Sequence, residues 1–121
     1  MERLQVKMVD LYYLHRISDI KIEEIAKAMG KLIKEGLIRG WGLSHVDIDV
    51  ITKAQNITPL SAIQNIYSLV ERDSEEKIIP YCIQNNIGFV PFSPLPININ
   101  IFFKGEGLNL KFKLVVLKNL F

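Results

Sequence analysis

Four residues that could bind or react with a ligand stand at or near the ends of four apolar segments: His15, Ser44, Gln64 and Phe92. A histidine can serve as a catalyst, although on an apolar segment it is more often a hydrogen-bonded core residue. Ser44 and Gln64 offer hydrogen-bonding groups, and Phe92 offers either core packing or a flat aromatic surface. Parallel α/β folds place their sites at the carboxyl ends of the strands. If the four segments are parallel strands, these residues meet at one end of a sheet.

Other kinds of chemistry find little support in the sequence. The chain has one cysteine and two histidines, which excludes an internal disulfide framework and a multi-cysteine zinc site, and we predict no metal site. Cys82 falls on the apolar side of an expected helix and reads as an inert buried thiol. A glycine-rich phosphate-binding loop is absent, because Gly40-Trp41-Gly42 is too short a pattern.

The elements that would position these residues alternate between strand and helix. Residues 9–15 form a short aromatic and apolar segment, typical of a strand buried on both faces, with Tyr12 and Tyr13 as core residues. Further strands are predicted at 38–44, 62–66 and 88–92. Three amphipathic helices fall between them. Ser18 or Asp19 is expected to cap the first helix and Ser74 the third, and the second helix is expected to start near Asp47 or Asp49.

This alternation predicts parallel strands joined by right-handed crossovers. Units of about 25 residues occur in doubly wound sheets and in (β/α)8 barrels, and periodicity alone leaves both open. Because strand side chains alternate, an inward Ser44 puts Gly40 and Gly42 inward too, leaving room at the centre. Trp41 and Leu43 would then pack under the helices. A buried stripe in the last helix is expected to include Cys82 and Ile83.

Composition limits the remaining classes. The chain has 121 residues, is 49% hydrophobic and carries a formal net charge of +2. This predicts one compact domain with no electrostatic case for a nucleic acid or an acidic membrane as partner. The first residues lack the apolar centre of a signal peptide, so we predict a cytoplasmic protein. Residues 97–121 change in character, alternating Ile, Leu or Phe with Asn or Lys, and are predicted to be an unrelated tail, either a hairpin or disordered.

Four ordered motifs together resemble the aldo-keto reductases. They span 10–16 (Asp-Leu-Tyr-Tyr-Leu-His-Arg), 32–44 (ending Gly-Trp-Gly-Leu-Ser), 62–69 (Ala-Ile-Gln-Asn-Ile-Tyr-Ser-Leu) and 88–95 (Gly-Phe-Val-Pro-Phe-Ser-Pro-Leu). The family fold is a (β/α)8 TIM barrel, so the resemblance implies a partial barrel in residues 1–96, truncated at both ends. By analogy it holds barrel strands four to seven, about four parallel strands and three helices.

The resemblance also implies a function. Family members use NADPH to reduce aldehydes or ketones, and His15 matches the histidine that orients the substrate carbonyl. Ser44 and Gln64 match the residues that bind the nicotinamide carboxamide, while Phe92 takes the place of the aromatic that stacks on the nicotinamide. Ser93 and Leu95 match the start of the pyrophosphate-side loop. His45 stands where the family usually has asparagine or glutamate.

The family's catalytic aspartate, tyrosine and lysine have no counterpart in this sequence. We therefore expect a reductase fragment that binds NADP(H) poorly and is inactive alone. Two alternatives stay open: a non-catalytic interaction module, and half of an enzyme completed in trans by a second polypeptide. Open sheet edges could also support self-association.

Overall fold

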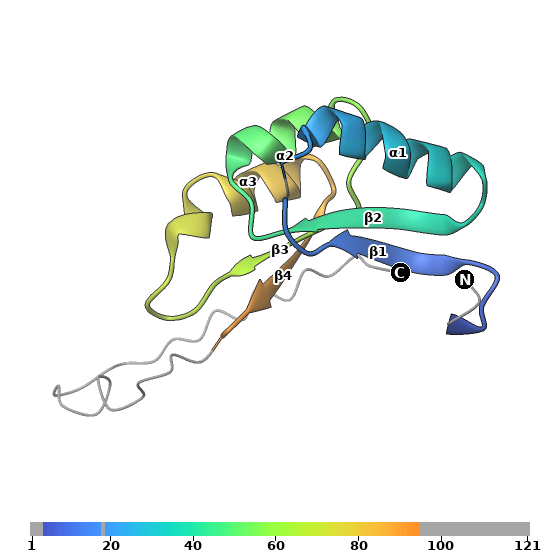
Figure 1. The fold of residues 1–121 in the computed structure, drawn as a ribbon. Helices are drawn as coiled ribbons and strands as arrows, with labels where there is room; N and C mark the ends of the chain where they lie inside the picture. Colours follow the sequence, from blue (N-terminus) through green and yellow to red (C-terminus); the bar gives the residue numbers. More distant parts are fainter. Residues whose placement is uncertain (1–3, 18, 95–121) are drawn as a thin grey trace, which may run out of the picture.

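The computed structural model describes residues 4–17 and 19–94. Strands and helices alternate along the described chain, as the sequence predicted (Figure 1). In chain order the elements are β1 (Val9–Leu14), α1 (Ile22–Lys34), β2 (Ile38–Ser44), α2 (Ile48–Gln55), β3 (Ala62–Ile66), the short 3-10 helix η2 (Asp73–Glu75), α3 (Ile78–Gln84) and β4 (Gly88–Phe92). The tail at 97–121 lies outside the described residues, so its boundary at residue 96 and its hairpin or disorder stay predictions.

The four strands form one sheet in the order β1-β2-β3-β4, and every neighbouring pair is parallel. This confirms the predicted parallel strands. The register places Tyr13 opposite Gly42 and Ser44 opposite Gln64. Among the described residues, β1 and β4 each pair on one side only.

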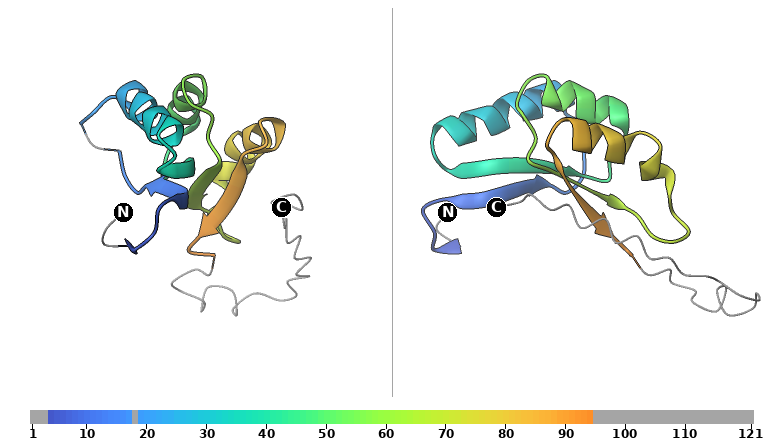
Figure 2. Two further views of the ribbon diagram at one scale, coloured as in Figure 1. Left: turned by 90° about the vertical axis from the view of Figure 1, so that its right-hand side faces the viewer. Right: turned by 180° about the vertical axis from the view of Figure 1, so that it is seen from behind.

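All three helices cover the same face of the sheet (Figure 2). Trp41 and Leu43 point under them and are 0% exposed, as predicted. The Trp41 indole N–H lies 3.3 Å from the carbonyl oxygen of Thr58 and 3.1 Å from that of Pro59. Thr58 in turn donates its hydroxyl to the Ala26 carbonyl in α1, at 2.6 Å. The core therefore ties β2 to both α1 and the end of α2.

The helix ends differ in how well they match the predicted boundaries. Asp47 caps α2, because its side chain accepts the Val50 N–H at 2.9 Å. Gly36 ends α1 in the left-handed region at φ 69°, and its N–H bonds to the Ile33 carbonyl at 3.0 Å. The predicted cap at Ser18 or Asp19 is wrong, because α1 begins three residues beyond Asp19, at Ile22, and Lys21 takes the cap position without a side-chain bond.

The last helix also begins later than predicted. Ser74 was expected to cap it, but Ser74 lies inside η2, and α3 begins at Ile78. The buried stripe is also narrower than predicted. Cys82 is 0% exposed, as predicted, whereas Ile83 is 55% exposed and the prediction that it is buried is wrong.

The other face of the sheet carries no helix in the part of the chain that the structure describes (Figure 2). This open face contains alternate residues of each strand, among them Leu11, Ile66 and Val90, which are 39%, 37% and 38% exposed. The prediction that residues 9–15 are buried on both faces is wrong, and Tyr12 is 47% exposed on the helix side. The reason is that, in the described part of the chain, β1 lies at the edge of the sheet, where fewer neighbours cover it.

The inner glycines leave less room than the sequence suggested. A Cβ atom at Gly42 would lie 2.6 Å from Cε1 of Tyr13 and 2.5 Å from the Ala62 carbonyl oxygen. Glycine at this position therefore allows the Tyr13 ring to lie directly across β2.

Among the described residues, no helix is long and apolar enough to cross a bilayer.

Candidate functional site

A cavity of about 630 Å³ opens where the strands end at their carboxyl side. It is lined by His15, Arg16, Ile17, Ser44, His45, Gln64 and Phe92. The four residues singled out first from the sequence are therefore brought together, one from each strand or its immediate end. Parallel pairing causes this, because it puts the carboxyl ends of all four strands at one edge of the sheet.

The other two predicted site residues are not part of this lining in the described structure. Ser93 follows β4 directly, is exposed and has a left-handed backbone at φ 50°. This region is uncommon for residues other than glycine. Leu95 lies outside the described residues.

Ser44 and Gln64 form the polar floor of the cavity. Ser44 is 5% exposed, and its hydroxyl lies 3.5 Å from Oε1 of Gln64, which is a long hydrogen bond. The two side chains are cross-strand partners on the open face. Together they present a hydroxyl donor, an amide donor and an amide acceptor side by side. This set matches the hydrogen-bonding needs of a primary carboxamide, which offers one oxygen acceptor and two N–H donors.

His45 also lines the cavity, although the sequence marked it only as a departure from the family pattern. It is exposed, and its ring centroid lies 6.1 Å from that of Phe92, with an angle of 47° between the planes. Its backbone is left-handed at φ 55°. Its place directly after Ser44 was the only signal for this role in the sequence. Arg16 and Ile17, which follow His15, were missed in the same way.

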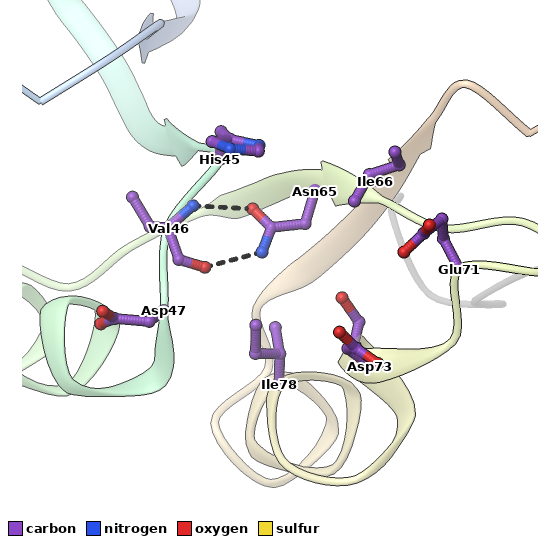
Figure 3. Close-up of a pocket in the computed structure, with 9 residues that line it drawn as sticks. His45, Val46, Asp47, Asn65, Ile66, Glu71, Asp73 and Ile78 are labelled. Carbon is purple, nitrogen blue, oxygen red and sulfur yellow. Dashed lines mark hydrogen bonds between the residues drawn. The ribbon is translucent and has the colours of Figure 1, made fainter.

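A second, smaller cavity of about 310 Å³ lies on the helix side of the same strand ends (Figure 3). Asp47, Glu71 and Asp73 line it, and His45 lines both cavities. Figure 3 shows the Asn65 side chain turned toward the backbone of Val46, between the two connections that follow β2 and β3.

The connection after β3 is held by a cluster of three side chains. Tyr67 donates its hydroxyl to Glu75 at 2.5 Å, and Arg72 pairs with the same carboxylate at 2.8 Å. The hydrogen bond to Glu75 is the main cause that raises the pKa of Tyr67, and the bond from Tyr67 is the main cause that lowers the pKa of Glu75. The cluster fixes η2 beside the strand ends.

Cys82 has no part in the site. Its side chain belongs to α3 and is fully buried in the core. Desolvation raises the pKa of the thiol to about 11. The thiol therefore stays protonated at neutral pH and is a poor nucleophile. This agrees with the sequence interpretation of an inert buried residue.

Comparison with known proteins points to one family. The model of the aldo/keto reductase family matches residues 1–97. A probable aldo-keto reductase of Glycine max is 42% identical over 109 residues, which cover 89% of this chain and 31% of that protein. The chain thus spans about a third of the length of this relative.

Solved structures agree with the sequence comparison. A glycerol dehydrogenase of Gluconobacter oxydans matches 74% of this chain and 28% of its own, at 32% identity and a TM-score of 0.70. An aldo/keto reductase of Klebsiella pneumoniae in complex with NADP and acetate matches 75% of this chain and 33% of its own, at 34% identity and a TM-score of 0.66. These matches confirm the predicted fold class, an α/β partial barrel.

Proposed function

Because the chain belongs to the aldo/keto reductase family, we propose that it provides the nicotinamide side of a site for NADPH-dependent reduction of an aldehyde or ketone. One observation carries the proposal: His15, Ser44, Gln64 and Phe92 come from four different strands and line one cavity. The cytoplasmic location predicted from the sequence stays a prediction.

Ser44 and Gln64 are the residues that would bind the nicotinamide carboxamide. On binding, the Ser44 hydroxyl would exchange its long bond to Gln64 for a bond to the carboxamide oxygen, which leaves Oε1 of Gln64 to accept a carboxamide N–H. Phe92 is half-buried at the cavity wall, so its ring offers a face for packing against the nicotinamide. By resemblance, Ser93 and Leu95 continue toward the pyrophosphate. When bound, the cofactor supplies the hydride.

His15 is the residue that would hold the substrate. It stands at the exposed rim of the cavity, directly after β1, where its ring N–H can donate a hydrogen bond to a carbonyl oxygen. Such a bond orients the carbonyl and stabilises the negative charge that develops on its oxygen. His15 therefore acts on the substrate side of the cavity, while Ser44 and Gln64 act on the cofactor side.

We further propose that these 121 residues alone do not turn over substrate. By resemblance, protonation of the alkoxide needs a tyrosine tuned by a lysine and an aspartate, and none of the three has a counterpart in the sequence. A general acid accelerates a reaction by roughly 10²–10⁴-fold. The remaining residues bind and orient but have no matched proton donor.

Association is a second candidate, favoured by the open face. Leu11, Ile66 and Val90 are each more than a third exposed there, and β1 and β4 have free sides among the described residues. Such edges readily pair with further strands. A second polypeptide that supplies the missing strands would complete the site in trans, and a second copy of this chain would cover the apolar surface. A well-folded monomer in size-exclusion chromatography that binds no apolar dye contradicts this candidate.

Binding of reduced nicotinamide mononucleotide, followed by its fluorescence, tests the cofactor side. This probe lacks the adenosine half, so it reports on the cavity alone. We expect Gln64→Ala to weaken binding by about 10-fold, the usual effect of losing one hydrogen bond in a closed site. Gln84→Ala, at an exposed position at the end of α3, is the matched control and should bind like the wild type.

The activity test uses NADPH and a nitrobenzaldehyde with the same purified chain. We expect no oxidation of NADPH above the background rate. Turnover would contradict the proposed inactivity, and equal probe binding by wild type and Gln64→Ala would contradict the site assignment.

A further inference from the structure

The backbone pairing between β2 and β3 stops at the cavity. Ser44 opposite Gln64 is the last paired position, and the next contact is the His45 N–H bonded to the Gln64 carbonyl at 2.9 Å. Beyond this point the two segments of the chain separate, because β2 leads into α2 and β3 leads into the connection before η2.

The Asn65 side chain bridges the gap that follows. Its Oδ1 accepts the Val46 N–H at 3.1 Å, and its Nδ2 donates to the Val46 carbonyl at 2.7 Å. A side-chain amide has the same donor and acceptor as a peptide group. Asn65 therefore adds one more rung to the sheet where no backbone is available (Figure 3). The residue is 7% exposed, so both bonds are shielded from water.

The two bonds between the Asn65 side chain and the Val46 backbone, which we call the Asn65 clamp, hold a strained residue in place. His45 sits between the last backbone bond and the Asn65 bonds, with φ at 55°. A left-handed backbone at a residue other than glycine costs on the order of 1–2 kcal/mol and persists only where the surroundings enforce it. The bonds on both sides of His45, together with the Asp47 cap on α2, enforce it here.

His45 connects the Asn65 clamp to the larger cavity. Asn65 does not line the larger cavity, whereas His45 lines it and faces the ring of Phe92. We propose that Asn65 is a positioning residue, whose paired bonds to Val46 fix the backbone of His45 and thereby the arrangement of Ser44, His45 and Phe92 around the ligand. The inference rests on the proposed function only for the identity of that ligand.

Hydrogen exchange and ring resonances test the clamp without any ligand. Asn65→Ala removes both bonds, so the Val46 amide should exchange at least ~10-fold faster, and the His45 and Phe92 ring resonances should shift. Asn65→Asp keeps the acceptor for the Val46 N–H but places a carboxylate against the Val46 carbonyl. It should retain protection of that amide and still shift the His45 ring.

Asn85→Ala is the matched control, because Asn85 also donates its side-chain amide to a backbone carbonyl, that of Tyr81 at 2.9 Å, but away from the cavity. It should leave the Val46, His45 and Phe92 signals unchanged. If Asn65→Ala does not fold, Asn65→Asp still decides the matter. Unchanged His45 and Phe92 resonances in Asn65→Asp would overturn the inference.

Ligand binding separates this inference from the proposed function. We expect Asn65→Ala to bind reduced nicotinamide mononucleotide about 10-fold more weakly than Asn85→Ala. Equal binding by these two variants, when the wild type binds the probe, would overturn the positioning role. If the wild type binds no probe, the proposed function fails, while the exchange and ring-shift results still support or refute the clamp.

Discussion

The two faces of the sheet are built from the same strands but differ in what covers them. On the helix side, Trp41, Leu43 and Ile63 are completely buried. On the open face, the alternate residues Leu11, Ile66 and Val90 keep more than a third of their surface in water. We conclude that packing against the helix layer stabilises this chain, whereas the binding groups lie on the open face and at the carboxyl ends of the strands.

Polar groups follow the same division. The Trp41 indole N–H on the helix side has two carbonyl partners. The Tyr13 hydroxyl on the open face is buried without a hydrogen-bond partner among the described residues, and burial raises its pKa. Buried polar groups are usually hydrogen-bonded, so the indole N–H and the hydroxyl differ in what their removal should cost.

The largest expected effect compares two isoleucines of β3. Ile63→Ala opens a cavity under the helices and should lower the free energy of unfolding by about 2–5 kcal/mol. Ile66→Ala removes the same atoms from a position that is 37% exposed on the open face, and should cost about 1 kcal/mol or less. Urea unfolding followed by circular dichroism measures both. Equal losses would mean that the two faces contribute equally to stability.

A smaller effect compares the two buried donors. Trp41→Phe leaves the carbonyls of Thr58 and Pro59 without their indole partner and should cost about 1–3 kcal/mol. Tyr13→Phe removes a hydroxyl that has no described partner, so its stability should be unchanged or slightly higher. Thermal unfolding of the two variants decides the comparison, and a marked loss in Tyr13→Phe would show that its hydroxyl is bonded in solution.

The smallest effect concerns pH and the connection after β3. The lowered pKa of Glu75 adds stability above the ordinary value of 4.5, and this contribution is lost as the pH falls through the lowered pKa. The raised pKa of Tyr67 adds stability below the ordinary value of 10.0, which is lost as the pH rises through the raised pKa. Tyr67→Phe should weaken the dependence of Tm on pH in both windows. Superimposable pH profiles for wild type and variant would contradict this.

The sequence predicted the parts of the fold that depend on local pattern. The four strands and three helices stand where alternation of apolar and polar residues put them, and Trp41 and Leu43 face the helices. It failed at boundaries such as Ser74, because an unforeseen 3-10 helix precedes α3, and it failed at Ile83, which is exposed. Capping preferences name several candidates, and only the packed chain selects one.

The candidate site was predicted in part. Four of its residues were identified at strand ends, and the structure brings them to one cavity. His45 was noted in the sequence only as a departure from the family pattern, because its left-handed backbone and its position beside the Phe92 ring have no sequence signature. The Asn65 clamp was missed for a similar reason, since its partner Val46 is 19 positions away along the chain.

The sequence by itself determined the order of strands and helices. It also determined which side of each strand carries large apolar residues, because a periodicity of two or of 3.6 residues is a local property. Only the tertiary structure determined which side chains lie next to each strand. Edge position left Leu11 and Tyr12 exposed, and cross-strand pairing placed the Tyr13 ring over Gly42 and the Ser44 hydroxyl beside Gln64. These contacts depend on neighbours that the chain meets only after its crossovers have brought the strands into register.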